Sequence, residues 1–131
     1  FVSFSFCKED VDEPKLIEID LTQEILPLES PKWANYVIGV LALFLERLKP
    51  NKKRLFQMLI GTSVPIGGGL SSSASVEVAM CTFLESLYRT SSTHTQELSK
   101  LDKALLCRNA EQQYALKQLF TESSTHNFTP K

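Results

Sequence analysis

The chain has 131 residues, which is enough for one domain with one hydrophobic core. Its hydrophobic content of 43% and charged content of 22% are those of an ordinary soluble globular protein. The net charge is −1 and the single basic cluster is Lys52–Arg54, so nothing indicates a nucleic-acid partner. No apolar run approaches the ~20 residues that a membrane-spanning helix needs, so we expect no membrane association.

The cysteines and histidines point to neither a disulfide framework nor a metal site. Cys7, Cys81 and Cys107 are odd in number and show no Cys-x-x-Cys spacing. We expect Cys81 and Cys107 to be buried, reduced thiols within helices, and a reducing, cytoplasmic compartment. His94 and His126 lie in polar stretches without neighbouring ligands, so we expect no metal role for them.

Two strands are predicted at the start of the chain. Val2, Phe4 and Phe6 alternate with serines, and Ile17, Ile19 and Leu21 alternate with acidic residues. We expect the two strands to pair antiparallel, although the seven-residue acidic turn between them, 8–14, says little about their register. The chain also starts within an apolar strand, without an initiator Met or a signal peptide, and we therefore expect it to be the middle of a longer protein.

Helical and strand patterns then alternate. A period of 3.6 predicts helices over 33–48 and 74–87, and a last helix from Leu98 to about Tyr114. The nearly continuous apolar run from Leu55 to Ile60 is typical of a buried central strand. This order predicts an α+β domain, with helices packed on a mostly antiparallel sheet. The polar residues 121–131 predict a disordered tail.

A glycine- and serine-rich segment, Val64–Ser75, separates the predicted strand from the second helix. Three consecutive glycines allow positive φ and a close approach of backbone N–H groups to a ligand. Ser71, Ser72 and Ser73 supply hydroxyls and suit the N-cap of the following helix, whose N-terminus attracts anions. The segment therefore predicts a phosphate-binding loop, although it lacks the Gly-Lys-Ser/Thr of the P-loop NTPases and the spacing of a dinucleotide fingerprint.

This segment resembles the second motif of the GHMP small-molecule kinases, Pro-x-Gly-x-Gly-Leu-x-Ser-Ser-Ala. The flanks Pro31-Lys-Trp-Ala-Asn-Tyr-Val37 and Cys107-Arg-Asn-Ala-Glu-Gln-Gln-Tyr114 are similar to the galactokinases, one branch of that family. The resemblance covers Val2 to about Ala115. It implies a partial GHMP kinase N-terminal domain, of the α+β type, over residues 1–115, and a divergent tail over 116–131.

The resemblance also implies a set of site residues. ATP phosphates would contact the loop, and Ser73 and Glu111 would bind Mg²⁺, which prefers hard oxygen ligands. Without the family, Glu111 would be taken for an exposed helix-surface carboxylate. Trp33 and Tyr36 resemble the walls of an adenine pocket, but two aromatics that anchor a helix onto the sheet would give the same pattern. The residues implied in nucleotide binding are Gly67, Gly68, Gly69, Ser71, Ser72, Ser73, Trp33 and Tyr36.

Other parts of the family pattern do not occur in the sequence. The segment that binds the sugar, the Gly-x-x-Cys-Gly-x-Met-Asp-Gln string with the catalytic Asp and the third glycine motif are absent. The resemblance implies ATP-dependent phosphorylation of galactose by an intact, monomeric parent, and we expect this chain alone to be inactive. A non-catalytic, sugar-sensing relative remains an alternative. So does a GHMP kinase for N-acetylgalactosamine, mevalonate or homoserine.

Overall fold

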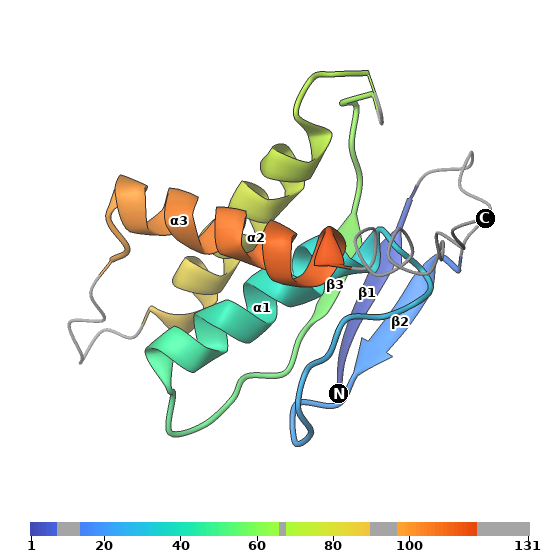
Figure 1. The fold of residues 1–131 in the computed structure, drawn as a ribbon. Helices are drawn as coiled ribbons and strands as arrows, with labels where there is room; N and C mark the ends of the chain where they lie inside the picture. Colours follow the sequence, from blue (N-terminus) through green and yellow to red (C-terminus); the bar gives the residue numbers. More distant parts are fainter. Residues whose placement is uncertain (8–13, 66–67, 90–96, 118–131) are drawn as a thin grey trace, which may run out of the picture.

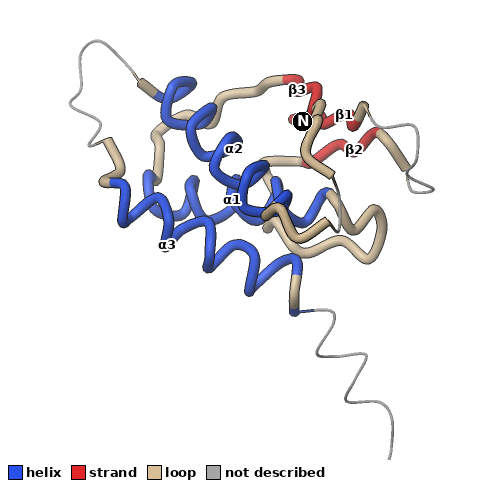
Figure 2. Tube along the Cα trace, turned by 90° about the horizontal axis from the view of Figure 1, so that it is seen from above, coloured by secondary structure: helices blue, strands red, loops and turns tan. Residues whose placement is uncertain are grey.

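The computed structural model of the chain describes residues 1–7, 14–65, 68–89 and 97–117. They form an α+β fold in which a layer of helices lies beside a three-stranded sheet (Figures 1 and 2). The elements, in chain order, are β1 (Val2–Phe6), β2 (Leu16–Ile19), α1 (Ala34–Leu48), β3 (Gln57–Ile60), α2 (Ser72–Tyr88), α3 (Lys100–Ala110) and a π-helical turn, η1 (Glu111–Ala115).

The sheet has the order β2-β1-β3 and is mixed. β1 pairs with β2 in the predicted antiparallel direction, with Phe4 opposite Ile17. β1 pairs with β3 in parallel, with Phe4 opposite Met58. β1 and β3 are joined by a long connection that contains β2 and α1, and parallel neighbours require such a long connection. The α+β class is therefore confirmed, although one of the two pairings is parallel.

The prediction that residues 55–60 form a buried central strand is wrong. β3 begins at Gln57 and lies at the edge of the sheet, and β1 takes the central place. The side chains of Leu55 and Leu59 are 66% and 71% exposed. An apolar run predicts a strand that can be buried on both faces. It does not determine whether other elements of the described chain cover those faces.

The core lies between the sheet and the helices. Val2, Phe4 and Phe6 on β1 are buried, as their alternation predicts, and each such side chain contributes about 1.5–3 kcal/mol when removed from water. α1 is the central helix and packs against α2, α3 and η1 (Figure 2). Its buried face has the predicted period, with Val37, Val40, Leu41, Phe44 and Leu45 among its members.

The helices over the second half of the chain differ in detail from the prediction. α2 begins at Ser72 instead of Ala74, and its fully buried positions are Glu77, Met80, Cys81, Leu84 and Tyr88. Val76, Phe83 and Leu87, which were expected in the apolar stripe, are only partly buried at its margin.

The last helix is divided in two. α3 is capped by the Ser99 side chain, which accepts a hydrogen bond of 3.0 Å from the Asp102 N–H. Its final turn widens into η1, where the Leu116 N–H donates to the Glu111 carbonyl at 2.9 Å. Within the described parts of the chain, no helix is both long and apolar enough to span a membrane. Of the predicted tail, 116–131, only Leu116 and Lys117 are described; residues 118–131 lie outside the described residues, and their disorder stays a prediction.

Candidate functional site

The glycine loop ends at the first turn of α2, and its backbone has two residues with positive φ. Gly69 has φ +73°, and a Cβ there would meet open space, so its conformation explains the glycine. Ser71 has φ 55° and ψ 45°, a left-handed conformation that costs a non-glycine residue about 1–2 kcal/mol. Gly68 is exposed, and Gly67 lies outside the described residues.

Ser71 is the N-cap residue of α2, but its side chain makes no capping hydrogen bond. The expected capping by the serine row is therefore not observed. The left-handed backbone directs the Ser71 carbonyl to the Ser75 N–H, at 3.0 Å, and leaves the first N–H groups of the helix without a side-chain acceptor. These N–H groups and the positive end of the helix dipole favour a negatively charged ligand at Ser72 and Ser73.

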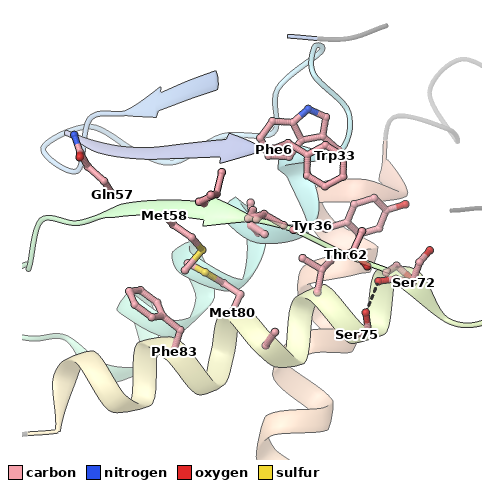
Figure 3. Close-up of a pocket in the computed structure, with 17 residues that line it drawn as sticks. Phe6, Trp33, Tyr36, Gln57, Met58, Thr62, Ser72, Ser75, Met80 and Phe83 are labelled. Carbon is pink, nitrogen blue, oxygen red and sulfur yellow. Dashed lines mark hydrogen bonds between the residues drawn. The ribbon is translucent and has the colours of Figure 1, made fainter. Parts of the chain in front are cut away.

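A cavity of about 780 Å³ opens between β3 and α2 (Figure 3). One end is lined by Trp33, Tyr36, Thr62, Ser72 and Ser73, and thus combines aromatic rings with hydroxyl groups. The other end is mostly apolar. The residues of that end that Figure 3 labels are Gln57, Met58, Met80 and Phe83. The volume is in the range of small-molecule sites, which pair an apolar wall with a few polar groups.

Trp33 lies at the cavity but is also tied to the sheet. Its indole ring stacks on Phe6, with ring centroids 5.1 Å apart and planes inclined by 20°. Its Nε1–H donates to the Pro14 carbonyl at 2.9 Å. The two roles considered for Trp33 are thus compatible, because one face of the ring packs on β1 and the residue still lines the cavity.

Tyr36 follows one turn later on α1 and lines the same end of the cavity. Burial raises the pKa of its hydroxyl, and the nearby carboxylates of Glu111 and Glu77 raise it further. Tyr36 therefore lines the cavity and lies near two acidic side chains, one on α2 and one on η1. Its neutral hydroxyl is a hydrogen-bond donor in this acidic environment.

Glu111 is the first residue of η1 and is half-buried, so it is not the exposed surface carboxylate that its helix position alone suggested. The π-helical turn that it begins is a rare local geometry that often occurs at functional sites. Gly68, Gly69, Ser71 and Glu111 are not among the residues that line the cavity. The cavity wall thus contains four of the residues implied by the resemblance, namely Trp33, Tyr36, Ser72 and Ser73.

A divalent cation is compatible with these residues. Among the described residues, no group of three or more His, Cys, Asp or Glu side chains could hold a metal ion. Mg²⁺, however, commonly uses one or two carboxylates together with substrate phosphates and water. An oxygen of Glu77, Oε1, is buried and has no hydrogen-bond partner among the described residues, and a cation is the kind of partner that it lacks.

Glu77 is the residue of this region that the sequence analysis missed. A signal was present: Glu77 is in helical phase with Cys81, Leu84 and Tyr88, at spacings of four, seven and eleven residues. A carboxylate within a buried stripe is rare unless it is paired or binds a metal. Burial and the Glu111 carboxylate raise its pKa to about 8.

Comparison with known families identifies the class of domain to which the fold and the loop belong. Residues 35–118 match the family described as "GHMP kinases N terminal domain". The match covers more than half of the chain, and the chain belongs to this family. It includes α2, Glu111 and, apart from Ala34, all of α1, and it contains the cavity-lining residues Tyr36, Ser72 and Ser73.

The chain is similar to several galactokinases. It is 40% identical to the galactokinase of Bos taurus over 116 residues, which cover 87% of this chain and 27% of that protein. The galactokinase of Homo sapiens is 39% identical over the same share of both chains. The galactokinase of Pasteurella multocida is 40% identical over 97 residues, 74% of this chain and 23% of that protein. The chain thus spans about a quarter of the length of the relatives it matches.

Proposed function

We propose that this chain supplies the ATP-binding part of a galactokinase, which transfers the γ-phosphoryl group of ATP to the C1 hydroxyl of galactose. The observation that carries the proposal is the arrangement of Ser72 and Ser73, at the uncapped start of α2, beside a cavity walled by Trp33 and Tyr36. The relatives are named galactokinases, and their identity of about 40% extends over most of this chain.

In this proposal the triphosphate lies over the first turn of α2, and the base lies toward Trp33 and Tyr36. Phosphoryl transfer depends on positioning and on neutralising charge more than on covalent chemistry by the protein. The galactose C1 oxygen forms a bond to the γ-phosphorus, the bond from that phosphorus to the β–γ bridging oxygen breaks to release ADP, and the hydroxyl proton passes to a base or water that the residues named here do not supply. Mg²⁺, held by Ser73 and Glu111, would neutralise charge on the phosphate oxygens.

The same proposal includes a cytoplasmic location. The three cysteines, Cys7, Cys81 and Cys107, are all free thiols, which agrees with a reducing compartment. The chain contains no assigned catalytic base or sugar site. We therefore expect the 131-residue chain alone to bind ATP without turning over galactose.

Trp33 provides the test, because it is the only tryptophan in the sequence. Its fluorescence should change on addition of ATP with Mg²⁺ and saturate with nucleotide concentration. A chimera in which this chain replaces the matching segment of bovine galactokinase should then show galactose-dependent release of ADP. A fluorescence titration without change would contradict the proposal. So would a chimera that is inactive while unmodified bovine galactokinase is active in the same assay.

A further inference from the structure

Glu77 is a buried acidic residue that the proposed function does not use. It lies in the middle of α2 and is 2% exposed, although glutamate is almost never fully buried without a partner. Its Oε1 atom has no hydrogen-bond partner, and none of the ion pairs among the described residues includes it. A carboxylate that is buried without a hydrogen bond or an ion pair needs a positive charge to compensate its own.

A second acidic residue of the same helix shows the contrast. Glu85 lies two turns further along α2 and is also largely buried, but its carboxylate pairs with Lys103 on α3 at 2.5 Å. The same helix pair, α2 and α3, therefore provides a cation for one buried glutamate and none for the other. The part of the chain that the structure describes contains no lysine or arginine paired with Glu77.

The groups that face Glu77 are acidic or neutral. Glu111 on η1 acts on Glu77 through its negative charge. Glu77 in turn raises the pKa of Tyr36 on α1, after burial and Glu111. It also raises the pKa of Cys107 on α3, where the hydrogen bond with Cys81 and burial are larger causes. Three neighbouring elements thus surround Glu77 and provide no compensating charge.

Ser73 lies four residues before Glu77 on the same helix. Residues at this spacing are neighbours on one helix face, so the Ser73 hydroxyl and the Glu77 carboxylate project from successive turns. Ser73 lines the cavity, and Glu77, one turn further along α2, is buried. The Glu111 carboxylate lies near enough to Glu77 to raise its pKa, so two carboxyl groups, from α2 and η1, lie close to the helix face that carries the Ser73 hydroxyl.

We propose that Glu77 is a third protein ligand of the divalent cation, beside Ser73 and Glu111. This rests on the proposed binding of Mg²⁺ with ATP. A divalent cation bound by Glu77 and Glu111 favours the ionised form of both groups and gives Oε1 of Glu77 the partner that it lacks. Mg²⁺ takes six oxygen ligands, so three from protein leave room for phosphate oxygens and water.

The test measures metal binding to the 131-residue chain without an activity assay. Mn²⁺ is the probe, and loss of the electron paramagnetic resonance signal of free Mn²⁺ gives its dissociation constant, with and without ATP. Glu77→Gln keeps the side-chain volume and removes the charge. It should raise the Mn²⁺ dissociation constant at least tenfold, as should Glu111→Gln. Glu85→Gln is the control on the same helix and should leave it unchanged within twofold.

The outcomes separate this inference from the proposed function. Weaker Mn²⁺ binding in Glu111→Gln with no change in Glu77→Gln would overturn the role of Glu77 and leave the proposed function intact. Wild-type chain that binds neither Mn²⁺ nor ATP would overturn the proposed function itself. If Glu77→Gln does not fold, crystals of the wild-type chain soaked in Mn²⁺ decide: the anomalous peak should lie within about 2.4 Å of a Glu77 carboxylate oxygen, and a peak at Ser73 and Glu111 alone would refute the proposal.

Discussion

Gly39 on α1 lies directly against Tyr114 on η1. A Cβ at position 39 would be 2.9 Å from the Tyr114 Cβ and 3.1 Å from the carbonyl oxygen of Ala110. The Tyr114 hydroxyl donates to the Ile25 carbonyl at 2.7 Å and fixes the other end of the side chain. This close approach places the turn that begins with Glu111 against the helix that carries Tyr36.

Gly39→Ala should therefore destabilise the fold. The added methyl group would collide with the Ala110 carbonyl oxygen and with the Cβ of Tyr114, whose side chain is fixed by its hydrogen bond. Overpacking of this kind costs about 1–3 kcal/mol of stability. Urea denaturation followed by circular dichroism measures the loss. Gly61→Ala is the matched control, since a Cβ there meets nothing within 4 Å. Equal stability of the two variants would contradict the close packing.

Ser71→Gly should stabilise the fold by about 0.5–1 kcal/mol, because glycine adopts the left-handed backbone without the steric cost that Ser71 bears. Lys49→Gly, at the end of α1 with φ 46°, should stabilise the fold similarly. The two variants differ in position: only Ser71 adjoins the proposed phosphate site. ATP titration of Trp33 fluorescence should change for Ser71→Gly if its hydroxyl contacts the nucleotide, and remain unchanged for Lys49→Gly.

Gly68→Glu should abolish ATP binding, because it adds a bulky negative charge to the loop proposed to hold phosphates. A Cβ at position 68 lies 3.2 Å from the Pro65 Cβ, a contact that a small shift relieves, so the fold should persist. Asn51→Glu adds the same charge in the turn between α1 and β3, away from the loop (Figure 1). Calorimetry with ATP and Mg²⁺ distinguishes them, and unchanged affinity in Gly68→Glu would remove the phosphate role of the loop.

The stability of the metal-free chain should fall as the pH rises from about 5 to 8. The pKa of Glu77 is about 8 in the folded chain, against an ordinary value of 4.5, because of burial and then Glu111. Below 4.5 the carboxyl is protonated in both states. Above that pH the unfolded chain releases the proton while the folded chain retains it, which favours unfolding by roughly 2–4 kcal/mol in all.

The measurement is urea denaturation in the presence of a chelator across this pH range. Glu77→Gln should lose most of the dependence, because its amide does not titrate. The difference in unfolding free energy between the wild-type chain and Glu77→Gln should therefore change between pH 5 and pH 8. A constant difference would mean that the Glu77 carboxylate is solvated or paired in solution.

One of the three cysteines should react quickly with a thiol reagent in the native chain. Cys7 is exposed, whereas Cys81 and Cys107 are 0% and 4% exposed. Titration with a chromogenic disulfide should label one thiol per chain at once and three after denaturation. Cys7→Ser should remove the fast phase. A native chain in which two or more thiols react fast would contradict the packing of α2 on α3.

Local patterns in the sequence determined much of the secondary structure. The alternation of Val2, Phe4 and Phe6 predicted β1 correctly, and the 3.6-residue period of α1 predicted its buried face. The glycine and serine segment predicted a loop that leads into a helix, and the structure has Gly69 at positive φ three residues before the start of α2. The burial of Cys81 and Cys107 followed from their helical phase. Each of these features depends on residues close together in the chain.

Only the tertiary structure decided which elements became neighbours. It placed β3 at an edge of the sheet and made its pairing with β1 parallel, across a connection that contains both β2 and α1. It also brought Glu77 from α2 close to Glu111 from η1, although 34 residues separate them. A sequence pattern reports the side chains that one element turns inward, whereas the partner of a buried charge comes from another element and depends on how the helices pack.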